Sequence, residues 1–168
     1  LAELLLGVPY LVAAGTGNVD PVRTGLVTPV SALIESPSTA AQLRVEALGV
    51  LGWIRTDATA FRLLAREVVK GTADDARAAA VRSLQRIPAT AWPNEDVEPL
   101  VRAIVTWVGA ASPERRTEPE FVEAIQLGDT LAASLPSDTG REVRRSLRAV
   151  KAPTFTRRDQ DGSLKRYT

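Results

Sequence analysis

Hydrophobic residues recur along this chain mostly three and four positions apart, which is the spacing of one face of an α-helix. Within residues 95–109, for example, Val97, Leu100, Val101 and Ile104 fall on one such face. Capping residues and Gly or Pro stops separate the helix-length stretches from one another. The pattern predicts eight helices, at residues 1–14, 20–35, 39–54, 58–70, 73–87, 95–109, 117–135 and 140–150.

Polar side chains mark the expected start of several of these helices. Asp57 and Asn94 stand where a side-chain oxygen accepts a backbone N–H of the first turn. Residues 117–120 (Thr-Glu-Pro-Glu) resemble a capping box with Pro in the first turn. Asp138 or Thr139 is the expected cap of the last helix. These starts come from local chemistry alone.

The last residues follow a different pattern. Residues 154–158 and 163–168 are typical of two short strands, and the Gly-containing segment 159–162 is typical of the turn between them. A lone two-stranded hairpin is marginally stable in water. We therefore expect a short extended or β-hairpin tail at residues 151–168, following a helical domain at residues 1–150.

Two of the predicted helices repeat one set of residue types. The paired positions, at a constant offset of 33 residues, are Arg44 with Arg77, Ala47 with Ala80, Leu48 with Val81, Leu51 with Leu84, and Ile54 with Ile87. A weaker third copy lies at Val143, Leu147 and Val150. Repeated helical hairpins bury too little surface singly, so they stack. The alternative is coincidence between Ala- and Leu-rich helices, whose periodicity is degenerate.

The residue types that are missing restrict the chemistry. The chain holds no His, Cys or Met, so it lacks the usual ligands of zinc, copper and haem and the Ser-His and Cys-His pairs of nucleophilic catalysis. We expect no metal, no cofactor and no enzymatic activity, and we assign no catalytic residue. Because the chain begins at Leu1 without any Met, we also expect a fragment or processed piece of a larger protein.

Charged residues are unevenly distributed along the chain. Residues 1–140 carry 12 Lys and Arg against 17 Asp and Glu, whereas residues 141–168 carry 9 against 3. On the last predicted helix, the spacing of three and four residues places Arg141, Arg144, Arg145 and Arg148 on one face. These four, together with Arg157 and Arg158 in the tail, are the candidate partner-binding residues. The alternative is a solvated helix face.

The basic end favours some partners over others. Residues 1–140 are net acidic and few aromatic side chains accompany the arginines, so the sequence disfavours nucleic acid. An acidic protein partner or an anionic membrane surface fits better, and a membrane-associated complex is a possible partner. Among the three tryptophans, Trp53 and Trp107 fall close to apolar positions of their helices. Trp92 precedes Pro93 in a loop, so we expect it to be exposed and to contact the partner.

A family resemblance is carried by the repeated helices and the loops after them. Residues 44–54 and 77–87 resemble the second helix of HEAT repeats. Residues 89–101, 116–119 and 124–132 are similar to the HEAT segment of large extracytoplasmic bacterial proteins. Those proteins join a dehydrogenase-like propeller, helical repeats, a haem-binding cytochrome c module and a cupredoxin module.

The resemblance implies an all-α fold: a HEAT-like α-solenoid of stacked helical hairpins with a C-terminal extended or β-hairpin tail. It also implies an extracytoplasmic location, in the periplasm or cell envelope. None of the family's haem or copper ligands is present in this chain. The expected function is a non-catalytic scaffold that binds a protein partner or links neighbouring domains of the same polypeptide. The alternative is an accessory structural subunit of a membrane-associated electron-transfer complex, docked through its basic end.

Overall fold

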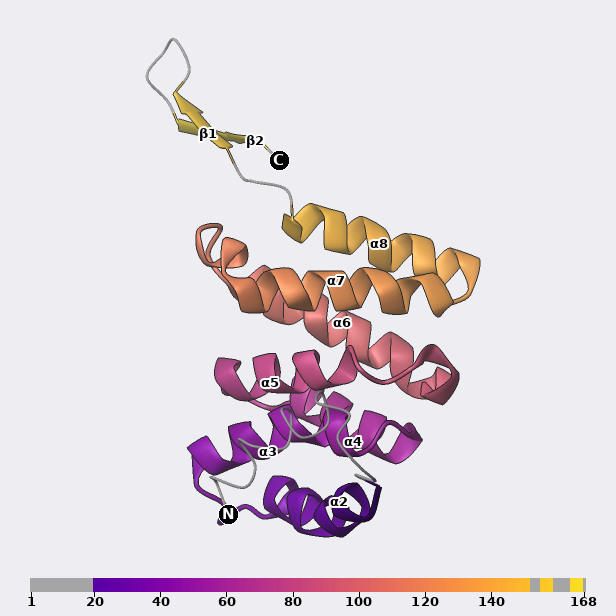
Figure 1. The fold of residues 1–168 in the computed structure, drawn as a ribbon. Helices are drawn as coiled ribbons and strands as arrows, with labels where there is room; N and C mark the ends of the chain where they lie inside the picture. The colour runs from indigo at the N-terminus through magenta and orange to yellow at the C-terminus, as the bar shows by residue number, and fades with distance from the viewer. Residues whose placement is uncertain (1–19, 152–154, 159–163, 168) are drawn as a thin grey trace. The chain divides into compact units, whose positions relative to one another are not determined.

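The computed structural model describes residues 20–151, 155–158 and 164–167, and its fold is all-α (Figure 1). The helices of these residues are α2 Asp20–Glu35, α3 Ala41–Ile54, α4 Ala58–Lys70, α5 Asp74–Leu84, α6 Asn94–Ala110, α7 Pro119–Ser134 and α8 Ser137–Lys151. Two short 3-10 turns, η1 Ala89–Ala91 and η2 Arg115–Thr117, lie in the connections. The predicted all-α class is therefore confirmed, while the helix expected at residues 1–14 lies outside the described residues.

Two helix boundaries in the described residues differ from the prediction by three residues, and the others agree to within two. Helix α5 ends at Leu84 because the amides of Arg86 and Ile87 donate to carbonyls only three residues back, at N–O distances of 3.1 and 3.0 Å. Helix α8 begins at Ser137, three residues before the predicted start. Its first turn is closed by the Gly140 amide, which donates to the Pro136 carbonyl at 2.7 Å.

Two predicted caps were wrong. Asp138 and Thr139 lie inside α8 and not at its N-terminal boundary. The capping box predicted at residues 117–120 does not form, because no side chain caps the start of α7. The Thr117 hydroxyl donates instead to the Glu114 carbonyl, at 2.7 Å. Local side-chain bonds of this kind compete with capping.

The chain divides into two compact units, Leu1–Asp96 and Val97–Thr168. In the first unit α3 packs against both α2 and α5, and α4 packs against α5. The two copies of the repeated pattern lie on α3 and at α5 and its C-terminal turn. Their apolar members are all buried: Ala47, Leu48, Leu51, Ile54, Ala80, Val81, Leu84 and Ile87. The shared pattern thus marks the buried face that each copy contributes to this unit.

A serine and a glycine lie where α3 and α5 approach each other closely. The buried Ser83 hydroxyl donates to the carbonyls of Leu48 and Gly49. A Cβ added at Gly52 would lie 2.5 Å from the Ser83 carbonyl oxygen. Gly52 therefore allows the two helix backbones to approach closely, which a side chain at this position would prevent.

In the second unit α7 packs against α8. Its core contains Ile104 of α6, Phe121 and Leu131 of α7, and Leu147 of α8, all with at most 1% of their surface exposed. The Trp107 and Phe121 rings lie 5.1 Å apart between centroids, at a tilt of 45°, within the range of favourable aromatic pairs.

Asp57 caps α4 as predicted. Its carboxylate accepts hydrogen bonds from the Thr59 and Ala60 amides, each at 3.0 Å, and pairs with Arg55 at 2.7 Å. Burial alone would raise the pKa of Asp57, but the bonds from Ala60, Arg55 and Thr59 hold that pKa below its ordinary value.

Replacing Asp57 with Ala is expected to lower the free energy of unfolding by about 1 kcal/mol at neutral pH, because the cap is lost. A lowered pKa in the folded state means that the charged carboxylate stabilises the fold above about pH 4 and that this contribution is lost as the pH falls further. Urea denaturation between pH 2 and 7 should therefore show the wild-type and variant curves converging in acid. Asp57→Asn, which keeps a capping oxygen, is the control, and a pH-independent gap would contradict the prediction.

Two strands follow α8. They are β1 Phe155–Arg158 and β2 Leu164–Tyr167, and they pair antiparallel with Phe155 opposite Tyr167 and Arg158 opposite Leu164. The predicted turn at residues 159–162 lies outside the described residues, so the hairpin tail as a whole stays a prediction.

Candidate interaction surface

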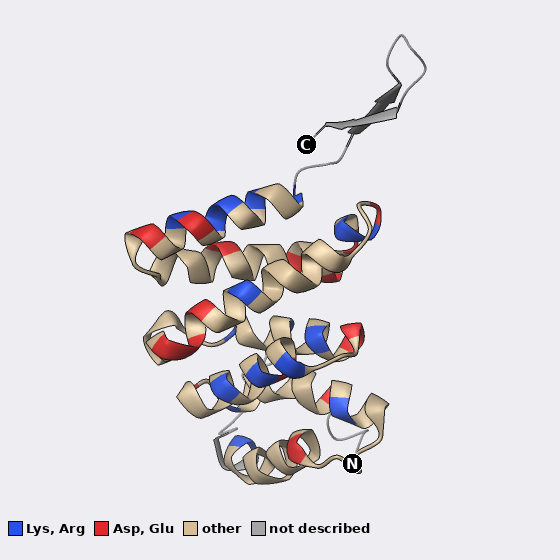
Figure 2. Cartoon of the chain, turned by 180° about the vertical axis from the view of Figure 1, so that it is seen from behind, with Lys and Arg blue, Asp and Glu red and all other residues tan. Residues whose placement is uncertain are grey.

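Helix α8 is strongly amphipathic. Val143 and Leu147 are 2% and 1% exposed and face the rest of the second unit. The opposite side carries four arginines, which together line one hollow at the surface: Arg141, Arg144, Arg145 and Arg148. We call these four residues the basic face. Figure 2 shows several Lys and Arg positions along α8, interrupted by Asp and Glu. Because all four predicted helical arginines line the same hollow, the structure places them together.

Among the described residues, two members of the basic face have partners and two have none. Arg141 pairs with Asp138, and the Arg144 Nε donates to the Gly140 carbonyl at 3.0 Å. Arg145 and Arg148 are exposed and form no hydrogen bond or ion pair with any residue in the described part of the chain. The positive charge of these two guanidinium groups is left to the solvent or to a partner.

The acidic residues nearest along the chain are already engaged. Glu142, the next acid on α8 after Asp138, pairs with Arg102 of α6 at 3.1 Å. Arg102 also pairs with Glu98 at 2.9 Å, and these two carboxylates raise the pKa of the Arg102 guanidinium. Glu142 is thus directed toward α6, and it does not neutralise the basic face.

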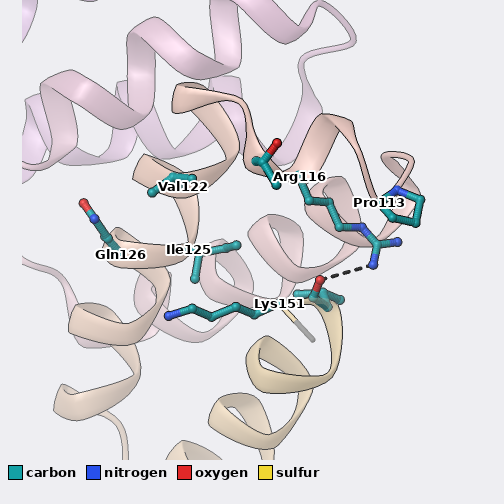
Figure 3. A pocket seen from close by; sticks show the side chains of 8 residues that line it. Pro113, Arg116, Val122, Ile125, Gln126 and Lys151 are labelled. Carbon is teal, nitrogen blue, oxygen red and sulfur yellow. Dashed lines mark hydrogen bonds between the residues drawn. The ribbon is translucent and has the colours of Figure 1, made fainter. Parts of the chain in front are cut away.

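A pocket lies beside the C-terminal end of α8 (Figure 3). It encloses about 300 Å³, and its apolar lining comes from Pro113, Val122, Ile125 and Val150. Lys151 also lines it. Val122 remains 39% exposed, which is unusual among the large hydrophobic side chains that the structure describes. Apolar walls beside the cationic side chains of Arg116 and Lys151 are suited to a ligand that is itself amphipathic.

One arginine organises the wall of this pocket. The Arg116 guanidinium donates to the carbonyls of Gly109 and Ala111, at and just beyond the end of α6, each at 3.0 Å. It also donates to the Val150 carbonyl of α8 at 3.1 Å, the bond drawn as a dashed line in Figure 3. Unbonded carbonyls at helix ends carry partial negative charge, which a guanidinium stabilises. The local sequence pattern does not reveal this role of Arg116, because its acceptors lie up to 34 residues away along the chain.

Two of the arginines predicted to bind a partner lie in the tail. Arg157 and Arg158 lie on β1, and their part in partner binding stays a prediction.

Trp92 belongs to the first unit and is half-buried, so its predicted exposure was wrong. Its indole nitrogen donates to the Ile87 carbonyl at 3.0 Å, and its ring lies 6.4 Å from that of Phe61. These contacts give Trp92 a structural role, while a contact with a partner stays a prediction.

The other two tryptophans also have partners within the chain. The Arg86 guanidinium lies over the Trp53 ring, 4.2 Å from its centroid, an attractive cation–π geometry. Trp107 is 6% exposed and packs on Phe121. Both side chains therefore contribute to the packing of their own units.

Comparisons with protein-family models, with curated proteins and with solved structures found no match for this chain. Within residues 20–151, 155–158 and 164–167, no helix is both long and apolar enough to cross a bilayer. The same residues contain no group of three or more acidic side chains placed to hold a metal ion.

Proposed function

We propose that this chain is a non-catalytic scaffold of the HEAT-like α-solenoid type, with an extended or β-hairpin tail, that binds a protein partner through the basic face of α8. The partner is a separate protein or a neighbouring domain of the same polypeptide. Support for the solenoid architecture comes from the direct packing of α3 against α5, where the repeated pattern occupies buried positions in both copies.

The binding proposal rests on the exposure of Arg145 and Arg148 and on their lack of acidic partners among the described residues. Both lie on a helix whose opposite face is buried. Arginine is enriched in the binding hot spots of interfaces and pairs bidentately with carboxylates. An acidic protein surface would supply the charge that this helix does not find among the described residues.

A purely structural explanation competes with binding. The terminal helix of a repeat array needs a polar outer face for solubility, and arginines can provide it. Such a face works equally well with acidic residues, so reversing its charge would leave the protein intact and change no interaction. The two explanations therefore predict different outcomes for a charge reversal.

The test uses the intact chain as bait in a native pull-down from its source, with mass spectrometry of the proteins retained. Arg145→Glu combined with Arg148→Glu is expected to reduce capture of the partner by roughly 10-fold or more, because like charges then oppose its acidic surface. Added salt should weaken capture by the wild type. Equal capture by this variant and the wild type would contradict the proposed docking surface.

Arg66→Glu is the matched control for this experiment. Arg66 is an exposed arginine of α4, has no partner among the described residues, and belongs to the first unit. Its reversal changes the net charge in the same direction without touching α8, so capture should persist. Loss of capture in both variants would indicate a general charge effect in place of a specific surface.

The accessory-subunit alternative shares this docking surface and differs in the partner. Recovery of cytochromes from the membrane fraction, lost on reversal of Arg145 and Arg148, would assign the chain to an electron-transfer complex. Recovery of a soluble acidic protein would instead support the general scaffold.

A further inference from the structure

The pocket beside Lys151 has room for a side chain that the described residues do not supply. Its volume is about 300 Å³, and a cavity of about 150 Å³ is large enough to hold a benzene ring. Val122 and Ile125 come from successive turns of α7, and Figure 3 shows them on one side of the pocket, with Lys151 alongside. One large aliphatic side chain would cover the exposed part of Val122.

The pocket is held open by bonds that do not depend on an occupant. Arg116 joins the Gly109, Ala111 and Val150 carbonyls through three hydrogen bonds. Its guanidinium is thereby fixed at the pocket wall, and the end of α8 is fixed relative to the end of α6. A site that is already shaped costs less ordering on binding.

Charge indicates what kind of segment the pocket accepts. Lys151 is exposed and has no partner among the described residues. Arg148 and Arg144 precede it by three and seven residues, so positive side chains follow one another along α8 toward the pocket. An occupant with carboxylates next to its aliphatic side chain would match both parts of this surface.

The chain's own tail is a poor match. Residues 152–168 carry four basic residues, at Arg157, Arg158, Lys165 and Arg166, against only Asp159 and Asp161. Their net positive charge is repelled by Lys151 and the basic face. The complementary segment is therefore expected to be an acidic protein segment other than residues 152–168.

We propose that the pocket binds one aliphatic side chain of an acidic protein segment, whose carboxylates pair with Lys151 and Arg148. This inference rests on the proposed function, in which the basic face docks a protein, and it specifies the chemistry of that protein. The aliphatic side chain supplies apolar burial, and the carboxylates supply the orientation along α8.

The test measures the anisotropy of two fluorescent peptides on titration with the intact chain. One peptide is rich in Glu and Asp and has a single central Leu, and the other has Ser in place of that Leu. The Leu peptide should bind roughly 10-fold more tightly, as expected for burial of a leucine side chain. Arg145→Glu with Arg148→Glu should weaken both peptides.

Val122→Ser should abolish the difference between the peptides, whereas Val69→Ser should preserve it. Val69 is the matched control, since it is 41% exposed on α4 of the first unit. A difference that persists in Val122→Ser would overturn the pocket assignment. Equal binding of both peptides, with loss in the arginine variant, would overturn the pocket while sparing the basic face; no binding of either peptide would overturn both.

Methyl NMR of Val122 and Ile125 identifies the occupant directly. The Leu peptide should shift these methyl signals and the Ser peptide should not. A shift caused by Phe155→Ala without peptide would assign the pocket to the chain's own tail. A shift that depends on protein concentration without peptide would assign it to a second copy, and either result would overturn the proposal.

Discussion

Replacing Gly52 with Ala is expected to lower the free energy of unfolding by about 2–3 kcal/mol. The added methyl group would lie 2.5 Å from the Ser83 carbonyl oxygen and 2.9 Å from its Cα. Both atoms belong to backbone and cannot move aside as a side chain can, so α3 and α5 must separate. Separation also strains the bonds from the Ser83 hydroxyl to the Leu48 and Gly49 carbonyls. Urea denaturation followed by circular dichroism measures the loss.

Gly49→Ala is the matched control on the same helix. A Cβ added at Gly49 would have no heavy atom of another described residue within 4 Å. The substitution should therefore raise the free energy of unfolding by about 0.5–1 kcal/mol, because Ala has a better helix propensity than Gly. The two changes are chemically identical and three residues apart. If both stabilise the protein, the close approach of α3 and α5 is wrong.

Replacing Phe121 with Ala is expected to cost about 3–5 kcal/mol, the largest effect of a single substitution considered for the second unit. The Phe121 side chain is 1% exposed and packs on the Trp107 ring. The Arg115 guanidinium lies 5.1 Å from the centre of its ring on another side. Truncation leaves a cavity in the core and removes the aromatic pair together with the cation–π contact.

Val122→Ala is the control for Phe121, since it removes apolar atoms from the adjacent residue of α7 at a position that is 39% exposed. It should change the free energy of unfolding by no more than about 0.5 kcal/mol, as expected for surface positions. The same denaturation experiment compares the two variants. A loss below about 1.5 kcal/mol for Phe121→Ala would contradict its place in the core.

Local patterns predicted the helices well, because helix formation depends on residues three and four positions apart. The predicted segments at 20–35 and 58–70 have the bounds of α2 and α4. Asp57 caps α4 through two backbone amides, as its place before the helix indicated. The predictions failed where a neighbouring turn competes, as at Thr117, whose hydroxyl bonds backward to Glu114.

The candidate site was predictable only in part. Arg141, Arg144, Arg145 and Arg148 share one helix, so their spacing alone placed them on a common face. Which of them lacks a partner depends on Asp138, Gly140 and the tertiary pairing of Glu142 with Arg102. The pocket was not foreseen, since α7, α8 and the loop before η2 must meet to form it.

The predicted exposure of Trp92 was wrong, because its contacts come from residues that are not its neighbours along the chain. A tryptophan before Pro93 in a connecting segment favours exposure when only neighbours along the chain are considered. The structure brings Phe61 of α4 against its ring and the Ile87 carbonyl against its indole nitrogen. Sequence patterns do not contain these contacts, because they join different elements of the first unit.

The sequence by itself determined the all-α class, most helix positions, the repeated buried pattern at an offset of 33 residues and the basic face of α8. Each of these follows from periodicity or from side chains that are close along the chain. Only the tertiary structure decided the close approach at Gly52, the Arg116 bonds to two helix ends and the absence of partners for Arg145 and Arg148 among the described residues. Those features depend on distances between residues remote in sequence, which packing sets and a local pattern does not record.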